Sequence, residues 1–334
     1  MGTALLFQSE DTHHLTKEKK KAPFVLKPHH ERILEALYHY HFLTVEQVTR
    51  LLYSKGSLTS VRSLLAQLAS NEYAMHLYLP RPTPTGSVPK IYTLARRGIN
   101  YLKKQGYDVP TRFHPSEQEE KSYLFLRHTL AVNDFLIAAS LLEKQFPAFH
   151  LSEVLHERVL KREEPIPVSY ELLTAEGKPV LDKDDKPVVE TMRLIPDAFV
   201  DMRIEQPDID KTYRYCLMLE LDRATIEEKN FRKKVRGLLT FIKTGRCMKH
   251  FGTKFPTIAF VNAVGGIKRR EQMKRWTEKE LKKSKEAHFW TELFMFTNLP
   301  EDEAINPETM FLSPVWYMPF QSKPTVVFSA GSRS

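Results

Sequence analysis

The chain has 334 residues, 42% hydrophobic and 27% charged, which is ordinary for a soluble globular protein and enough for two domains with cores. Its formal net charge of +9 favours a polyanionic partner such as nucleic acid. Two cysteines, Cys216 and Cys247, are too few for a disulfide framework or a zinc module. No apolar run of membrane-spanning length and no signal peptide is visible, so we expect a cytoplasmic protein without a membrane partner.

The amino-terminal part begins with residues 1–28, which contain several lysines without sustained apolar periodicity and are expected to form a flexible basic tail. Residues 29–106 predict three short helices, a hairpin with a tip rich in Pro, Thr and Gly, and a last helix. Thr44 and Gln47 form a capping-box pattern at the start of the second helix. This order of elements is typical of a winged helix-turn-helix domain.

In a winged helix, the third helix enters the major groove and the hairpin lies along the DNA backbone. The side chains predicted to contact bases or phosphates from the third helix are Thr59, Ser60, Arg62, Ser63 and Gln67. The side chains predicted to neutralise phosphates from the wing and the helix after it are Arg81, Lys90, Arg96 and Arg97. The pattern leaves a second interpretation open, in which the winged helix mediates protein contacts or dimerisation.

The remaining chain predicts a linker over 107–120, a mixed-sheet α/β domain over 121–320 and a carboxy-terminal tail over 321–334. The domain opens with a long apolar helix from residue 121 to about 144. Its polar residues His128, Asn133 and Asp134 are expected to cap or pin neighbouring backbone. A later basic helix over 266–286 predicts either a solvated mixed-charge face or a phosphate-contacting face.

Three acidic residues lie at the ends of two predicted strands. Glu220 and Asp222 end the apolar strand Tyr215–Leu221, and their spacing places both on the same face. Asp197 stands at the head of the strand over 198–200. Acids gathered at the ends of core strands are costly to bury unless they bind a cation or a proton. The pattern therefore predicts a divalent-metal site for phosphodiester chemistry, or the remnant of one.

The order of these features resembles the replication-relaxation proteins of plasmids and integrated mobile elements, from about residue 30 to Trp316. The segments that carry the resemblance, after the winged helix, are Arg127–Leu136 (RHTLAVNDFL), Glu157, Ile195–Ile204 (IPDAFVDMRI), Met218–Thr225 (MLELDRAT) and a helix that contains lysines. The resemblance implies a carboxy-terminal core similar to the restriction-endonuclease fold, with its PD-(D/E)xK signature. It also implies a role in replication, relaxation or transfer of the host element, with double-stranded DNA and replication or conjugation proteins as partners.

In the nuclease signature, Asp197 and Glu220 match the acids that hold Mg²⁺ or Mn²⁺, for which oxygen ligands are suited. Glu157 matches an additional upstream acid of such sites. The resemblance thus assigns a catalytic site in which the metal ligands would be Asp197, Glu220 and Asp222.

The sequence departs from the signature at its lysine, because Asp222 stands in that position. An acid cannot neutralise charge that develops on a phosphate, although it can bind metal. Lys233 or Lys234, from the predicted next helix, is the candidate replacement.

Two residues that follow the acids have alternative roles. Arg223 would either clamp a phosphate or hold Glu220 and Asp222 together in a structural cluster without metal. Thr225 is predicted to cap the following helix. The favoured function is DNA binding with a degenerate nuclease-like site. The alternatives are a Mg²⁺-dependent nuclease or nickase, and a transcriptional regulator or interaction module that does not cut.

Overall fold

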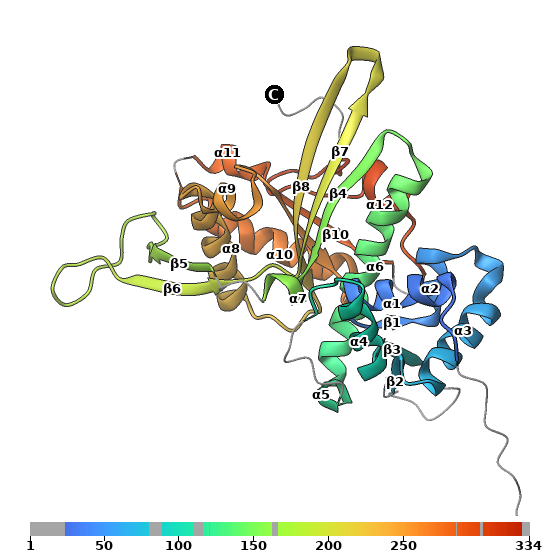
Figure 1. Ribbon diagram of the computed structural model, residues 1–334. Coiled ribbons are helices and arrows are strands. Elements are labelled where there is room, and N and C mark those ends of the chain that lie inside the picture. Colours follow the sequence, from blue (N-terminus) through green and yellow to red (C-terminus); the bar gives the residue numbers. More distant parts are fainter. Residues whose placement is uncertain are drawn as a thin grey trace, which may run out of the picture.

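The computed structural model describes residues 24–79, 89–109, 116–119, 121–161, 166–284, 286–300 and 303–328 (Figure 1). Most of the predicted basic tail, the hairpin tip that contains Arg81, and the last six residues lie outside the described residues. Helices and mixed sheets alternate along the chain, so the fold is mixed α/β as predicted.

The amino-terminal elements follow the predicted order, and a short additional strand pairs with the hairpin to make a three-stranded sheet of order β1-β3-β2. In chain order they are α1 (Pro28–Tyr40), β1 (Leu43–Thr44), α2 (Val45–Leu52), the 3-10 turn η1 (Lys55–Ser57), α3 (Leu58–Ser70), β2 (Ala74–Tyr78), β3 (Lys90–Leu94) and α4 (Arg96–Lys104).

Local sequence signals account for the ends and faces of these helices. Thr44 Oγ1 accepts a hydrogen bond from the Gln47 N–H, and Gln47 Oε1 accepts one from the Thr44 N–H, both at 3.1 Å. The predicted capping box is therefore present and supplies partners for amides that the first helical turn leaves free. On α3, Val61, Leu65 and Leu68 are fully buried at helical spacing.

The larger part of the chain is built on a five-stranded sheet of order β10-β9-β8-β7-β4, in which β8, β9 and β10 are parallel and β4, β7 and β8 are antiparallel. Its elements are α5 (Ser116–Glu119), α6 (Tyr123–Gln145), β4 (Phe149–His156), α7 (Glu157–Leu160), β5 (Ile166–Glu171), β6 (Val189–Leu194), β7 (Ala198–Gln206), the 3-10 turn η2 (Pro207–Ile209), β8 (Lys211–Asp222), α8 (Glu228–Lys243), α9 (Arg246–Phe251), β9 (Thr257–Asn262), α10 (Gly266–Leu281), α11 (Ala287–Thr291), β10 (Phe294–Asn298) and α12 (Pro307–Leu312).

Side chains of β8 alternate between two apolar layers, as expected for a central strand. Leu217 and Leu219 pack in the cluster that contains α6, whereas Met218 packs in the cluster that contains α8 and α10. Glu220 and Asp222 are two and four residues after Met218 on the same strand, so they lie with it on the face covered by α8 and α10.

The helix α6 joins the two parts of the protein. Its Asn133 donates to the carbonyls of Tyr40 and Phe42 at 3.0 and 2.6 Å, and Gln47 of α2 donates to the Leu130 carbonyl at 2.9 Å. The prediction that polar residues of this helix pin neighbouring backbone is confirmed for Asn133. As a result, one continuous apolar cluster contains residues of α1 to α4 and of the central sheet.

By length and composition alone, α6 is also long and apolar enough to cross a membrane, which the sequence analysis did not anticipate. More than half of that apolar stretch is buried inside the protein, a property of core helices in soluble proteins. Within the described residues we therefore assign α6 to the core.

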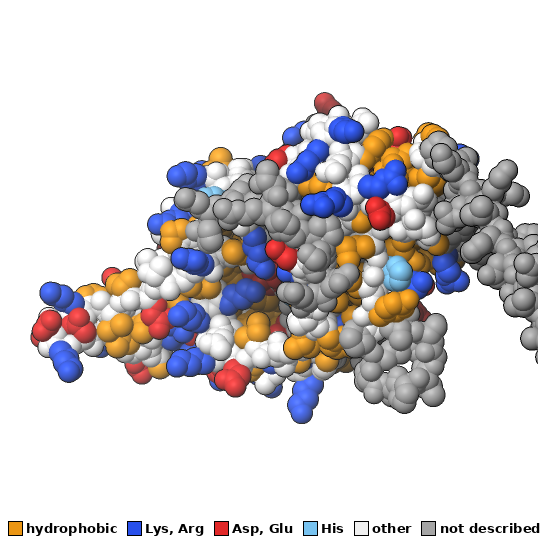
Figure 2. All heavy atoms as spheres, turned by 60° about the horizontal axis from the view of Figure 1, so that its bottom comes forward, with side chains coloured by type: hydrophobic (Ala, Val, Ile, Leu, Met, Phe, Trp, Pro, Cys, Tyr) orange, Lys and Arg blue, Asp and Glu red, His pale blue; other side chains and the backbone are white. Residues whose placement is uncertain are grey.

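Between β5 and β6 the chain forms an arm that projects from the body (Figure 1). The arm contains turns, with positive φ angles of 79° at Gly177 and 58° at Asp185. Figure 2 shows that this projection carries both acidic and basic side chains.

At the carboxy-terminal end, the described part of the predicted tail packs on the core. Trp316 pairs with Thr325, and Phe328 stacks on Phe311 with ring centroids 5.3 Å apart. In the predicted linker, Tyr107 donates to Glu35 at 2.9 Å and Val109 is buried. The domain boundaries themselves stay a prediction.

Candidate functional site

The fold brings the three predicted acids to one edge of the central sheet. Ala198 of β7 pairs with Leu219 of β8, and the Asp197 N–H donates to the Leu219 carbonyl at 3.0 Å. The same antiparallel register places Asp197 opposite Glu220, with Asp222 one pleat further on. The site therefore depends on strand pairing between residues far apart in sequence.

Asp197 is held from two sides. Its Oδ1 lies 3.1 Å from Nε2 of His128 on α6, and its Oδ2 accepts a hydrogen bond of 2.7 Å from the Leu221 N–H. Burial raises the pKa of Asp197, but the His128 hydrogen bond and the charge of Lys234 outweigh it and hold the pKa below its usual range. Burial lowers the pKa of His128, and the bond to Asp197 more than reverses this and raises it. The two side chains thus favour a charged pair.

Glu220 is 1% exposed and forms an ion pair with Lys234, which reaches it from α8. Burial raises the pKa of Glu220 to about 8, even though Lys234 opposes this shift. Burial lowers the pKa of Lys234, but the carboxylates of Glu220 and Asp197 outweigh it and raise the pKa. Lys234 thus stands at the position that the sequence analysis proposed for a replacement lysine.

Asp222 is bound by Arg269 of α10 through two parallel hydrogen bonds, Nε to Oδ2 at 2.7 Å and Nη2 to Oδ1 at 3.0 Å. Its Oδ2 also accepts from the Ala224 N–H at 2.9 Å. Arg269 is 7% exposed and donates to the Ile226 carbonyl at 2.7 Å. This arginine of the predicted basic helix therefore serves neither a solvated face nor a phosphate-contacting one.

The other two predicted catalytic residues lie nearby but have different partners. Lys233 points to Glu190, at 3.4 Å, rather than to the acids. Glu157 begins α7, pairs with Lys161 at 2.5 Å, and donates its backbone N–H to the Asp197 carbonyl at 2.9 Å. Glu157 is thus beside the site, whereas Lys233 faces away from it.

The fit of these residues to a divalent metal can be judged from their oxygens. Both oxygens of Asp222 accept from Arg269, both oxygens of Asp197 have donors, and Glu220 faces Lys234. Among the described residues, no group of three His, Cys, Asp or Glu side chains is arranged to hold a metal ion. The three acids are thus engaged by separate donors and cations rather than gathered around one point for Mg²⁺ or Mn²⁺, and their metal role stays a prediction.

A cavity of about 300 Å³ opens beside the acids. Its lining residues are Leu124, His128, Asp197, Leu221, Arg223, Thr225, Ile226 and Lys234. Their charges are mostly positive, which suits an anionic ligand.

The cavity corrects two expectations about the turn after β8. The predicted cap Thr225 does not cap α8, because the residue before that helix is Glu227; Thr225 lines the cavity instead. Arg223 does not hold Glu220 and Asp222 together, since Lys234 and Arg269 do so.

His128 and Arg269 are the members of this site whose roles the sequence analysis missed. His128 was expected to pin backbone, yet it pairs with Asp197. The sequence signal for it is a polar residue within a largely apolar helix, which it shares with Asn133 and Asp134. No spacing rule links Arg269 to Asp222, because the contact depends on how α10 packs on the sheet.

The structure places the residues predicted to contact DNA in the amino-terminal part. The α3 side chains Thr59, Ser60, Arg62, Ser63 and Gln67 are all exposed. Lys90 and Arg96 are also exposed. Arg97 donates to the Asn71 carbonyl at 3.0 Å and lies over the Tyr73 ring, so it stabilises the turn between α3 and β2. Arg81 lies outside the described residues.

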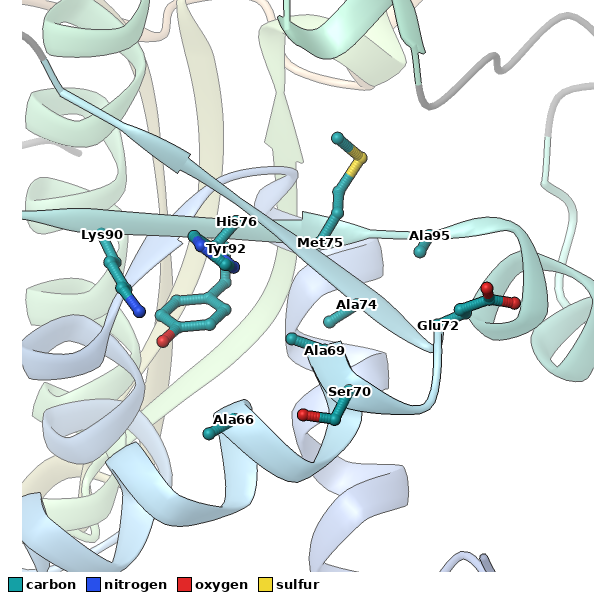
Figure 3. Close-up of a pocket in the computed structure, with 10 residues that line it drawn as sticks. All are labelled: Ala66, Ala69, Ser70, Glu72, Ala74, Met75, His76, Lys90, Tyr92 and Ala95. Atoms are coloured by element: carbon teal, nitrogen blue, oxygen red, sulfur yellow. The ribbon is translucent and has the colours of Figure 1, made fainter. Parts of the chain in front are cut away.

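A second cavity, of about 470 Å³, lies between α3 and the β2–β3 hairpin (Figure 3). Small side chains of α3, including Ala66 and Ala69, line one side. Lys90 and Tyr92 of β3 and His76 of β2 gather on the other. The lining therefore includes one cation, Lys90, and one acid, Glu72, and it has little side-chain bulk on the helix.

Two histidines at the carboxy-terminal end of α1, His39 and the C-cap His41, differ in their surroundings. His39 is exposed, whereas His41 is buried and shares a hydrogen bond of 2.8 Å with Gln118.

Comparison with known proteins gives one finding about family. No curated protein and no solved structure matches the chain. The sequence model of the replication-relaxation family matches residues 34–257, which is more than half of the chain, runs from within α1 to the start of β9 and includes all three acids. The protein therefore belongs to the replication-relaxation family.

Proposed function

We propose that this protein binds duplex DNA through a winged helix formed by residues 28–104, and that this binding serves the replication or relaxation of a plasmid or mobile element. Family membership supports the role in replication or relaxation. The observation that carries the DNA-binding part is the division of α3 into a buried apolar face and an exposed face of hydrogen-bonding side chains. Such a face on the third helix is what major-groove contact requires.

The cavity between α3 and the hairpin supports the same proposal. Arg62 of α3 is close enough to Tyr92 of β3 to lower the pKa of that phenol, although burial raises the pKa overall. Lys90 lies at the same cavity. Small residues on the helix side would allow a sugar-phosphate backbone to approach closely, and Lys90 would neutralise a phosphate there.

The proposal is tested by fluorescence anisotropy with a labelled duplex over a series of salt concentrations. We expect tight binding at low salt. The logarithm of the association constant should fall linearly with the logarithm of the salt concentration. Arg62→Ala should weaken binding and lower the steepness of that dependence by about one unit if Arg62 contacts a phosphate. If Arg62 contacts a base, the affinity loss should depend on sequence instead.

The matched control is Lys183→Ala, because Lys183 is an exposed residue of the projecting arm and has no ion pair among the described residues. It removes the same charge from the protein without touching α3. Failure of the wild-type protein to bind any duplex at low salt would exclude the proposal. A protein that binds no DNA but alters promoter output or captures replication proteins would favour the interaction-module alternative.

Phosphodiester cleavage is the second candidate function. It is supported by Lys234, which reaches Glu220 from α8 beside Asp197 and the 300 Å³ cavity. The order α6, β4, β7, β8, α8, β9 and the acids at one sheet edge are compatible with a restriction-endonuclease-like core. In such a reaction a water oxygen bonds to phosphorus, the bond from phosphorus to the leaving sugar oxygen breaks, and that oxygen takes up a proton.

A further inference from the structure

Two arginines, Arg127 of α6 and Arg223 after β8, stand close together beside the acidic site. Arg223 is half-buried and donates to the Leu124 carbonyl at 3.4 Å. Arg127 is exposed, and its guanidinium lies 6.0 Å from the centre of the Tyr123 ring. In the described part of the chain, neither forms a salt bridge with a carboxylate, so both charges lack a direct acidic partner.

The proximity of these two charges is costly unless an anion compensates it. Burial lowers the pKa of Arg223, and the charge of Arg127 lowers it further. Most arginines at this edge have partners: Arg269 binds Asp222, and Arg50 binds Asp134. The Arg127–Arg223 pair therefore differs from its neighbours in having unused guanidinium donors.

The arginine pair lies where two cavities meet. Arg223 lines the 300 Å³ cavity that contains Asp197 and also a cavity of about 530 Å³, which Arg127 lines as well. The larger cavity extends to Thr44 and Gln47 at the start of α2. A ligand bound at the arginines could thus touch both the amino-terminal part and the acidic site.

The larger cavity is not strongly positive as a whole. Besides the arginines it holds Glu46 and Glu303, together with Asp134, which is paired with Arg50. The smaller cavity is the more positive of the two, because its lining combines Arg223, Lys234 and His128 with one carboxylate, Asp197. An anion is therefore favoured at the mouth of the smaller cavity.

We infer that Arg127 and Arg223 together bind one backbone phosphate of DNA at the mouth of the cavity that contains Asp197 and Lys234. Guanidinium groups bind phosphate through paired N–H donors, which gives both charge neutralisation and orientation. The hydroxyl of Thr225, on the same lining, is a further donor. The inference rests on the proposed DNA binding and adds a second contact, distant from α3 in sequence.

The test compares binding of a labelled duplex and of its separated strands by the wild-type protein and by Arg127→Gln, Arg223→Gln and the double variant. The measured quantity is the slope of the logarithm of the association constant against the logarithm of the salt concentration. If both arginines hold the same phosphate, each single variant should reduce this slope by about one unit, and the double variant should reduce it little further. Loss with both forms of DNA would indicate a shared backbone contact, and loss with single strands alone would assign the clamp to an unpaired strand.

Two controls accompany this measurement. Arg127→Lys with Arg223→Lys keeps both charges and should retain the salt dependence while it weakens binding through loss of paired donors. Lys183→Gln with Lys186→Gln removes two exposed charges from the projecting arm and should leave binding unchanged. Urea unfolding of each variant checks folding, and Arg127→Gln, an exposed position, serves alone if the double variant is unstable.

The outcomes separate the two proposals. Suppose that Arg62→Ala weakens DNA binding, but that Arg127→Gln and Arg223→Gln change neither its affinity nor its salt dependence. That result would overturn the phosphate contact of Arg127 and Arg223 and leave the winged-helix proposal intact. Absence of wild-type binding to duplex and to single strands would overturn both.

Discussion

Lys234 of α8 forms a buried ion pair with Glu220 of β8, whereas the adjacent Lys233 lies 3.4 Å from Glu190 on β6. Successive residues of an α-helix are about 100° apart around its axis, so only one of two adjacent lysines can face the sheet edge. The packing of α8 on the sheet turns Lys234 toward Glu220, where its ammonium group pairs with the carboxyl group.

Substitution of Lys234 by Met should strongly destabilise the fold, because it leaves Glu220 buried without its cation. Burial raises the pKa of Glu220 to about 8, so the carboxyl takes up a proton once Lys234 is removed, and the cost is that of a buried polar group without its partner, about 1–3 kcal/mol. Lys233→Met, the matched control, removes a partly exposed pair and should cost less than about 1 kcal/mol. Urea unfolding of both variants measures the difference, and equal losses would show that the Glu220 pair is not buried as described.

The His128–Asp197 pair predicts a pH dependence of stability. The pKa of His128 is raised from 6.5 in the folded protein, so its stabilising contribution is complete below pH 6.5 and is lost as the pH rises through the folded pKa. The free-energy difference between wild type and His128→Gln should therefore shrink over that range. The pKa of Asp197 is lowered in the folded protein, so its carboxylate also stabilises the fold. That stabilisation is lost as the pH falls through the folded pKa of Asp197.

Urea unfolding at a series of pH values measures this difference. His150→Gln is the control, because His150 and Glu205 form a pair 3.2 Å apart in which both side chains are about half exposed. That substitution should not change the pH dependence appreciably, since solvent screens the pair. A constant difference between wild type and His128→Gln across the range would contradict the proposed pairing.

The nuclease alternative predicts nicking of supercoiled plasmid in the presence of Mg²⁺ or Mn²⁺. Asp197→Asn, which keeps the shape of the side chain but removes its charge, should abolish such nicking if Asp197 acts in cleavage. Gel analysis of relaxed plasmid measures the activity, and Lys183→Ala, purified in the same way, controls for contaminating nuclease. Equal nicking by wild type and Asp197→Asn would exclude catalysis by this site.

Metal binding is measured separately, by isothermal titration of Mn²⁺ into the wild-type protein. Because Asp197, Glu220 and Asp222 already have hydrogen-bond donors or cationic partners, we expect no tight site. Tight binding that Asp222→Asn removes would instead show that Arg269 yields its partner to a metal. That result would restore the three acids as a ligand set.

Gly98 on α4 predicts a packing constraint in the amino-terminal part. A Cβ atom there would lie 2.1 Å from the backbone carbonyl oxygen of Tyr73, which cannot move without shifting the turn before β2. Gly98→Ala should cost about 1–3 kcal/mol or more. Gly56→Ala, where a Cβ meets nothing within 4 Å, should be close to neutral in thermal unfolding. Comparable stability of the two variants would contradict the close approach of α4 to this turn.

Much of the secondary structure followed from local pattern. The capping box at Thr44, the buried stripe of α3 and the apolar strand β8 depend on residues within a few positions of one another, and all three are present. The helix start after β8 was less predictable. Thr225 is a good capping residue by type, but the turn through Ala224, with φ of 57°, delays the helix to Glu228.

By itself, the sequence determined that Glu220 and Asp222 share a strand face and that Asp197 stands at the head of another strand, because the twofold period of a strand is a local property. Tertiary structure alone decided the partners: His128 for Asp197, Lys234 for Glu220 and Arg269 for Asp222. These contacts join helices on both faces of the sheet to its edge. The strength of these three side-chain pairs depends on burial and on the distance between the groups, and the spacing of residues along the chain does not determine either of them.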